Sequence, residues 1–460
     1  ELWKSGNVWD LTIPYGEFPF GYESLLSFAL LLAGKETFFG AVHALIAVLA
    51  LLGTWLVARR YTRLPGGLLL FGLSLVFLSA LYVVKGNPFY IFNDQVDMIG
   101  KNDLFLAVGV LAALVHAPVG RAGGPAGAHR AHLPGLAFAT LLVLATKPAG
   151  MFMVAPLWLP VVWGWWRTWR GEGRFPWREA AFAAGVILPG GMWIVRNLAI
   201  IHTIFPEGVW VMNEWSIAKN LANPFFYAYL PRNFVFLLGV LGLALVTWVW
   251  RRKPGGRVML VFAVMFVAFL FTPESGFQKT TQEPTRVAWR LGIALVAYEL
   301  VGLLVGFEDL IQRCLDWLAT ARGLWQAAAG LALLGSVGFV GFRTGNLELN
   351  PGNDIVLRDE FREPVGVDGY HSPYDFVQRN IRNSVVEING GVFYYMYGPG
   401  YTNRPTKGQY PLGRAYMLPQ LDPQYYVVIP HGDAFPTTPE WDAKWKLIYQ
   451  DPEGLVFERR

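Results

Sequence analysis

Charged residues are scarce in this sequence. Asp, Glu, Lys and Arg make up 15% of the 460 residues, whereas 54% are hydrophobic. Soluble globular chains carry roughly 25% charged residues, so this composition excludes an ordinary soluble enzyme. A single cysteine, Cys314, excludes an intrachain disulfide framework. The net charge of +5 does not indicate a nucleic-acid partner, because the basic residues lie in short segments between apolar runs.

Long apolar runs are what the sequence has in abundance. Runs of roughly 15 to 20 residues match the length that crosses a hydrocarbon layer about 30 Å thick, and they predict an all-α polytopic membrane domain of about ten transmembrane helices. The predicted spans are Thr37–Val57, Pro65–Val84, Asp103–Pro118, Leu133–Lys147, Ala149–Trp166, Arg178–Ile194, Phe234–Trp250, Val258–Thr272, Val287–Gly306 and Gly323–Phe342. Tyr22–Ala33 is too short to span and predicts an interfacial or re-entrant helix.

Basic residues are concentrated in alternate loops between these spans. The set comprises Arg59, Arg60, Arg63, Arg121, Arg130, Arg167, Arg170, Arg174, Arg178, Arg251, Arg252, Lys253, Arg257, Arg313 and Arg322. Cytoplasmic loops of membrane proteins carry an excess of Lys and Arg. These loops are therefore predicted to face the cytoplasm. The segment before Thr37 and everything after Phe342 then face the outside.

Three regions follow from this topology. Residues 1–36 are predicted to form an outer loop with the interfacial helix, residues 37–343 the transmembrane domain, and residues 344–460 a small extracytoplasmic α/β domain. In the last region a helix is predicted at Tyr374–Ile381, and strands at Ser384–Ile388, Val392–Tyr397, Tyr425–Ile429, Lys446–Tyr449 and Leu455–Phe457, with a turn at Asp451–Gly454 before the last strand. The region's sequence has no phosphate-binding glycine pattern, so we predict a lid or partner-binding module.

Acidic residues cluster in the predicted outer segments. Glu17 lies among glycine, proline and aromatic residues, and fits either a base for a hydroxylated substrate or a solvated acid beside an interface anchor. Asp94 and Asp97 are three residues apart, so one helical turn would put both on one face. The two carboxylates could then bind a divalent cation or supply a general base. Their spacing matches no metal-loop signature, and a solvated loop is the alternative. Asp103 begins an apolar run and fits either a general base or a helix N-cap.

Two cations are predicted near the outer boundary of the membrane. Lys147 lies in an apolar run too long for one crossing, which Pro148 and Gly150 break into a tight turn. A cation near membrane depth is costly unless it is paired, and a lipid phosphate is its natural partner; snorkelling to the head groups is the alternative. Arg196 offers a planar fork of donors suited to phosphate, with an interfacial anchor as the alternative. His202 is predicted to be structural.

The order of these motifs resembles the GT-C glycosyltransferases, in particular the bacterial branch similar to protein O-mannosyltransferases and aminoarabinose transferases. The residues that carry the resemblance are Gly6, the segment with Pro19, Gly21 and Glu23, Asn102-Asp103, Thr146–Gly150, Trp193-x-x-Arg196-Asn197 and Pro206. In the tail, Tyr374-Asp-Phe376, Tyr397-Gly-Pro399, Ile448-Tyr449 and Val456-Phe457 resemble the outer domain of such proteins. The match is clearest over residues 1–210 and the tail.

The resemblance implies a transferase that takes a sugar from a polyprenyl-phosphate donor at the outer leaflet and gives it to a protein or lipid acceptor. It implies that Asp103 matches the family's second acidic position and that Lys147 and Arg196 lie near the donor phosphate. Lys85 is a further candidate for phosphate binding. The family's principal carboxylate lies in a loop whose downstream part corresponds to Glu1. We therefore expect either that this acid lies upstream of Glu1 or that the chain is an inactive relative.

The sequence also allows two other classes of function. A catalytically inactive GT-C-like subunit would scaffold a larger complex with other membrane subunits. A transporter would place charged residues near the middle of spans, where His43 and Glu299 are the candidates and helix packing is the alternative. Membrane lipids are expected partners in every case. A divalent cation at Asp94 and Asp97 is the one cofactor that the sequence raises.

Overall fold

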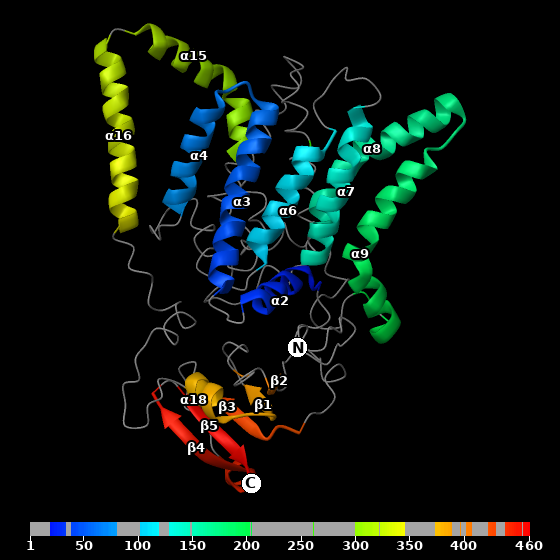
Figure 1. Cartoon of the computed structure of the whole chain (residues 1–460), viewed down its shortest axis with the longest axis vertical. Helices are drawn as coiled ribbons and strands as arrows, with labels where there is room; N and C mark the ends of the chain where they lie inside the picture. The colour runs from blue at the N-terminus through cyan, green and yellow to red at the C-terminus, as the bar shows by residue number, and fades with distance from the viewer. Residues whose placement is uncertain are drawn as a thin grey trace, which may run out of the picture. The chain divides into compact units, whose positions relative to one another are not determined.

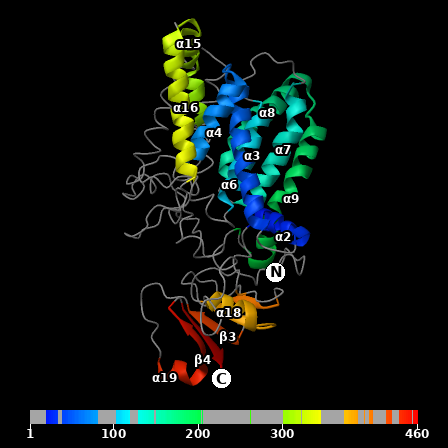
Figure 2. The same cartoon turned by 60° about the vertical axis from the view of Figure 1, so that its left-hand side comes forward.

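A computed structural model of the chain describes residues 19–33, 38–80, 102–118, 128–147, 150–202, 204, 261, 300–321, 323–345, 373–388, 396, 402–406, 422–428, 438–452 and 454–460. These residues fall in two compact units. One unit holds the helices from α2 to α9, up to Arg196, together with α15 and α16. The other holds the sheet of the C-terminal region (Figures 1 and 2).

The helical unit confirms most of the helices that the apolar runs predict. Its helices in the described residues are α2 (Gly21–Ala33), α3 (Phe38–Tyr61), α4 (Gly66–Ala80), α6 (Asp103–His116), α7 (Ala128–Thr146), α8 (Gly150–Glu172), α9 (Trp177–Ile201), α15 (Glu308–Thr320) and α16 (Gly323–Gly345). The predictions at Phe234–Trp250, Val258–Thr272 and Val287–Gly306 fall largely outside the described residues.

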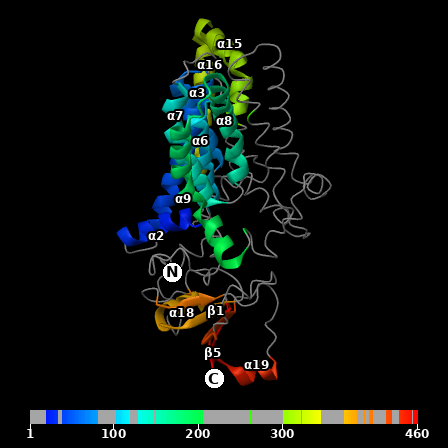
Figure 3. The same cartoon turned by 90° about the vertical axis from the view of Figure 1, so that its right-hand side faces the viewer.

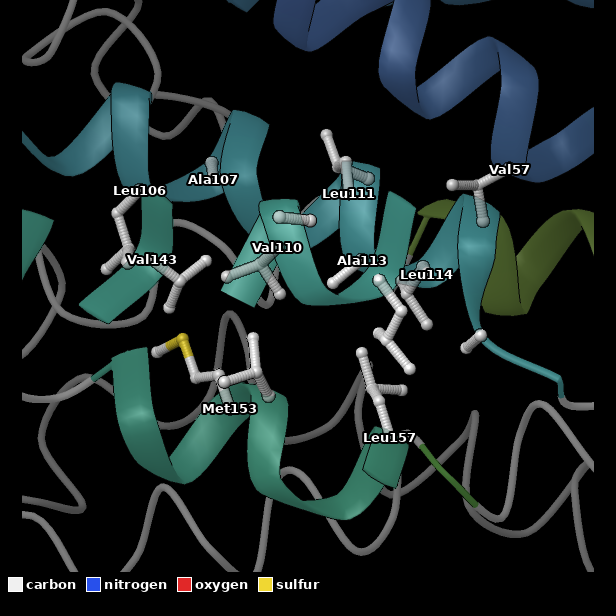
Figure 4. Close-up of a cluster of buried hydrophobic side chains, with 14 of the residues drawn as sticks. Val57, Leu106, Ala107, Val110, Leu111, Ala113, Leu114, Val143, Met153 and Leu157 are labelled. Atoms are coloured by element: carbon white, nitrogen blue, oxygen red, sulfur yellow. The ribbon is translucent and has the colours of Figure 1, made fainter. Parts of the chain in front are cut away.

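Helix α6 lies at the centre of this unit. Leu104, Leu111 and Leu114 are each at most 1% exposed, because neighbouring helices cover the helix on several sides. Figure 4 shows α6 side chains meeting residues of α3, α7 and α8, among them Val57, Val143, Met153 and Leu157. Lipid chains are as apolar as these side chains, so close packing rather than removal from water holds such helices together. The small residues Ala107 and Ala113 permit that close approach.

Large apolar side chains cover the outside of the helical unit. Exposed examples are Leu45, Val48 and Leu52 on α3, Leu159 and Val162 on α8, and Leu331 and Leu334 on α16. An extended apolar surface of this kind suits hydrocarbon rather than water. Within the described residues, one helix, Trp177–Ile200, is long and apolar enough to cross a membrane by length and composition. The count of ten spans stays a prediction.

Two short helices stand out from the bundle direction. α2 crosses the ends of α3 and α7 (Figure 1), and it confirms the short apolar helix predicted at Tyr22–Ala33. α15 lies at the opposite end, next to α16 (Figures 1 and 3), and it was not predicted. Leu310, Cys314 and Trp317 of α15 are all exposed, at the spacing of one helical face. Its run is too short and too charged to be recognised as a span.

The end of the bundle opposite α2 holds arginines that predicted the cytoplasmic side. The Arg63 backbone N–H donates to Glu308 Oε1 at 2.5 Å. The Arg60 guanidinium donates to the Ala117 carbonyl at 2.6 Å. The end of α3, the end of α6 and the start of α15 therefore meet at one end of the bundle, as the alternation of basic loops requires.

The C-terminal unit contains a five-stranded mixed sheet in the order β2-β1-β3-β5-β4. Its elements are α18 (Pro373–Asn380), β1 (Val385–Ile388), β2 (Arg404–Thr406), β3 (Tyr425–Val428), α19 (Pro439–Lys444), β4 (Trp445–Asp451) and β5 (Gly454–Arg459). β1 pairs in parallel with β2 and β3, whereas β5 is antiparallel to β3 and β4. Val377 and Ile381, on α18 and just after it, pack against Val386, Val427 and Val456 on one face of the sheet.

Most elements of this unit lie where the sequence places them. α18, β1, β3, β4 and β5 each match a predicted helix or strand within two residues at either end. The turn between β4 and β5 is closed by the Asp451 carboxylate, which accepts the Gly454 N–H at 2.8 Å. β2 was missed because it is three residues long and includes a proline, which suits an edge strand. The strand predicted at Val392–Tyr397 lies almost wholly outside the described residues.

Candidate functional site

Four segments that are far apart in the sequence meet at the α2 end of the helical bundle. They are the start of α2, the start of α6, the turn from α7 to α8, and the C-terminal half of α9 (Figure 1). Each segment carries one of the motifs that the sequence analysis singles out. The contacts that bring them together are hydrogen bonds and close backbone approaches, described in turn below.

Asn102 ties the start of α6 to the end of α7. Its Nδ2 donates to the Thr146 carbonyl at 3.0 Å. Asn102 occupies the N-cap position of α6 but its side chain makes no capping hydrogen bond. Asp103 is therefore the first residue of the helix and not its N-cap, which corrects the alternative reading of that residue. The hydrogen bond fixes the start of α6 beside Lys147, the residue after Thr146.

Trp193 and Gly190 hold α9 against α7. Trp193 is 2% exposed, and its Nε1 donates to the Leu144 carbonyl at 3.0 Å. One turn earlier, Gly190 lies so close to the Leu141 carbonyl that a Cβ there would clash with the α7 backbone. Small residues at such positions allow two helices in a membrane to approach backbone to backbone.

Arg196 is a buried cation at this end of the bundle. Its side chain is 3% exposed, and its Cζ lies 5.6 Å from the centroid of the Phe20 ring, just before α2. Arg196 follows Trp193 by three residues, and Lys147 follows Leu144 by three residues. The hydrogen bond between Trp193 and Leu144 therefore brings both cations to the same end. Burial strengthens the attraction of a cation for an anion, because less water screens it.

Lys147 lies in the turn between α7 and α8. Its N–H donates to the Val143 carbonyl at 3.2 Å, and its carbonyl accepts the Gly150 N–H at 3.0 Å. α7 ends at Thr146 and α8 begins at Gly150, so the predicted break in the long apolar run is confirmed. The Lys147 side chain is half-buried.

The first turn of α2 packs against the end of α7. A Cβ on Gly21 would lie 2.7 Å from the Ala145 Cβ and carbonyl oxygen, and the ring of the buried Tyr22 lies 5.8 Å from the Phe105 ring of α6. This packing places Glu23 at the same end of the bundle. The Glu23 side chain is exposed, yet desolvation raises the pKa of Glu23 to about 7, against a backbone hydrogen bond that lowers it.

The structure describes part of the predicted site. Glu17, Lys85, Asp94, Asp97 and Glu299 lie outside the described residues. Asp103 is placed by its backbone at the start of α6, the same end as Lys147 and Arg196. His202 is exposed, with φ 57° just after α9, the left-handed conformation that commonly ends a helix. In the part of the chain that the structure describes, no three His, Cys, Asp or Glu side chains are grouped to hold a metal ion.

The structure brings into this site three residues that have no predicted role. Phe20 and Glu23 lie in the motif before and within α2, and Asn102 lies beside Asp103. The signal for Asn102 was its position directly before Asp103 in the same motif. No pattern in the sequence pairs Phe20 with Arg196, because that contact depends on α2 crossing the end of the bundle.

The arrangement of these helices is shared with two solved structures, so the resemblance found in the sequence is supported at the level of the fold. More particularly, the chain is similar to ArnT from Cupriavidus metallidurans. Its apo crystal structure matches 99% of this chain and 90% of the ArnT chain, with 16% identity and a TM-score of 0.52. The crystal structure bound to undecaprenyl phosphate matches 99% and 91%, with 15% identity and a TM-score of 0.53.

At the level of sequence, no known family profile and no curated protein matches the chain. An identity of 15 to 16% shows a shared architecture and leaves substrate and activity to be argued from this chain's own residues.

Proposed function

We propose that this protein is a membrane glycosyltransferase that moves a sugar from a polyprenyl-phosphate donor to a protein or lipid acceptor. The reaction would take place on the extracytoplasmic face of a prokaryotic inner membrane, with the C-terminal unit on that side. The observation that carries the proposal is the convergence of Arg196 and Lys147 at the end of the bundle opposite Arg60 and Arg63. Undecaprenyl phosphate bound to ArnT, which has the same fold, supports a polyprenyl-phosphate donor.

In the proposed reaction an acceptor oxygen attacks the anomeric carbon of the sugar. The bond from that carbon to the phosphate oxygen breaks, the polyprenyl phosphate leaves, and the configuration inverts. Negative charge grows on the leaving phosphate as the bond breaks. The buried guanidinium of Arg196 and the ammonium of Lys147 would stabilise that charge more in the transition state than in the bound donor, which is what accelerates a reaction.

A carboxylate is needed to accept the proton of the attacking hydroxyl, or to orient the acceptor. Glu23 supports this role because a base is most effective with a pKa near the working pH, and its pKa is about 7. Asp103 lies at the same end of the bundle and is the second candidate. Glu17 and Asp94 remain predictions outside the described residues, as does a divalent cation at Asp94 and Asp97.

The test removes each cation separately. We expect Lys147→Ala and Arg196→Ala each to lower transfer by roughly 100-fold or more, the usual loss when one donor to a developing anion is deleted. Transfer would be measured in membranes supplied with a panel of polyprenyl-phosphate sugars. Arg313→Ala, at an exposed arginine of α15 at the other end of the bundle, is the matched control and should keep wild-type activity.

Full activity in both variants, with the control unchanged, would contradict the proposal. Binding of undecaprenyl phosphate to the purified wild-type protein distinguishes an active transferase from an inactive scaffolding subunit. A wild-type protein that binds undecaprenyl phosphate but transfers no sugar from any donor would favour the inactive scaffolding subunit. Thermal unfolding of each variant shows whether a loss of transfer comes from a loss of fold.

A further inference from the structure

The C-terminal half of α8 carries tryptophan and arginine side chains that the proposed glycosyl transfer does not use. Trp163, Trp166, Arg167 and Arg170, which we call the arginine–tryptophan ladder, are spaced by three and four residues and so share one helical face. Trp163 and Trp166 stack with ring centroids 4.6 Å apart. The Cζ of Arg170 lies 4.8 Å from the Trp166 ring centroid, and that of Arg167 lies 5.8 Å from the Trp163 centroid.

Within the described part of the chain, the arginines of the ladder and of the adjacent turn make no ion pair with a carboxylate. These four arginines, Arg167, Arg170, Arg174 and Arg178, all have exposed side chains. Stacking on tryptophan holds a guanidinium in place while leaving its N–H edge open for an oxygen ligand. This hairpin between α8 and α9 therefore presents four cations that are available to an anion.

The same helix supplies an apolar surface directly beside these cations. Leu159 is 61% exposed and Trp163 is 55% exposed. A single stripe on the helix surface runs from an apolar side chain to a guanidinium. It consists of Leu159, Trp163, Trp166 and Arg170, which are separated by four, three and four residues. Trp177, at the start of α9, is 72% exposed at the arginine end of the stripe. Exposed tryptophans are typical of the boundary between hydrocarbon and head groups.

We propose that the arginine–tryptophan ladder binds an anionic phospholipid of the inner leaflet. The phosphate would lie against Arg167 and Arg170, and an acyl chain would lie along Leu159 and Trp163. Charge complementarity selects an anionic lipid over a zwitterionic one, because the four arginines of this hairpin outnumber its two carboxylates, Glu172 and Glu179. The apolar stripe selects a lipid over a free anion. This inference does not depend on whether the chain transfers sugar.

The test measures lipid binding to the delipidated full chain in detergent. Phosphatidylglycerol, phosphatidylcholine and inorganic phosphate are titrated in turn, and the midpoint of thermal unfolding gives an apparent affinity for each. We expect phosphatidylglycerol to raise the midpoint and to bind more tightly than phosphatidylcholine, and inorganic phosphate to have no effect. One juxtamembrane arginine contributes about a fivefold gain in affinity for an anionic surface, so the double variant Arg167→Gln/Arg170→Gln should bind phosphatidylglycerol about 30-fold more weakly.

Two further variants test whether binding depends on these particular arginines and on the tryptophans that support them. Arg313→Gln removes an exposed arginine at the same end of the bundle that stacks on no ring among the described residues, and it should bind phosphatidylglycerol as the wild type does. Trp163→Leu/Trp166→Leu keeps all the charges and should still bind more weakly, because the guanidinium groups lose their supports. Wild-type affinity in the double arginine variant would overturn the proposal. An equal response to phosphatidylcholine, or to inorganic phosphate, would overturn it as well.

Discussion

A buried cation and a carboxylate of raised pKa define the candidate site at the scale of single residues. Arg196 owes its place to Trp193, whose hydrogen bond to the Leu144 carbonyl holds α9 against α7. Glu23 owes its pKa of about 7 to desolvation by the protein around α2. The residue types were predictable from the sequence, because an arginine is suited to bind phosphate and a carboxylate on the outer side is suited to act as a general base. The burial of Arg196 and the desolvation of Glu23 were not predictable, since both depend on other parts of the fold.

The raised pKa of Glu23 predicts a pH dependence of transfer. A general base works when deprotonated, so wild-type transfer should fall about tenfold for each pH unit below its pKa, which is about 7. Glu23→Gln should lower transfer and abolish this pH limb, whereas Glu23→Asp should keep a limb of similar shape. The measurement is the initial rate of transfer from pH 5 to 9. An unchanged limb in Glu23→Gln would assign the titration to another group.

Close helix contacts decide the arrangement at the scale of secondary-structure elements. The apolar runs located α3, α4, α6, α7, α8, α9 and α16, because a helix that is apolar on most faces is recognisable from composition alone. α15 was not predicted, because its apolar residues occupy only one face of a short charged helix. In the C-terminal unit the strands were predicted, but the parallel pairing of β1 with β2 and β3 was not, because pairing partners leave no local signal.

The approach of α9 to α7 predicts a contrast between two adjacent glycines. A Cβ on Gly190 would meet the Leu141 backbone, whereas a Cβ on Gly191 would have no atom within 4 Å. Gly190→Ala should therefore destabilise the protein by about 1–3 kcal/mol, the usual cost of overpacking. Gly191→Ala should leave stability unchanged or slightly raised. The midpoint of thermal unfolding in detergent checks both, and equal midpoints would contradict the close contact.

The division of charge between the two ends of the bundle sets the expected orientation at the scale of the whole molecule. Arg60 and Arg63 lie at one end with α15, and Lys147 and Arg196 lie at the other with α2. This arrangement agrees with the alternation of basic loops that the sequence shows. It also makes the transferase proposal coherent, because the two cations at the candidate site share one end.

The single cysteine offers a direct test of this orientation. Cys314 is exposed on α15, at the arginine end, so a membrane-impermeant maleimide should label it in inverted vesicles and leave it unlabelled in right-side-out vesicles. The matched variant Cys314→Ser/Lys446→Cys moves the thiol to an exposed position on β4, where the opposite result is expected. Labelling of both positions from the same side would contradict the predicted topology.

The sequence by itself determined the kind of molecule and the position of most of its helices. Scarce charge, apolar runs of membrane length and arginines in alternate loops are local properties, and each can be read without knowing what lies nearby in space. The tertiary structure decided which motifs form one site. Asn102 reaches Thr146, Trp193 reaches Leu144 and Arg196 meets Phe20 only after the helices have packed. Those contacts join residues far apart in the chain, and they depend on how closely two backbones approach, which no local pattern encodes.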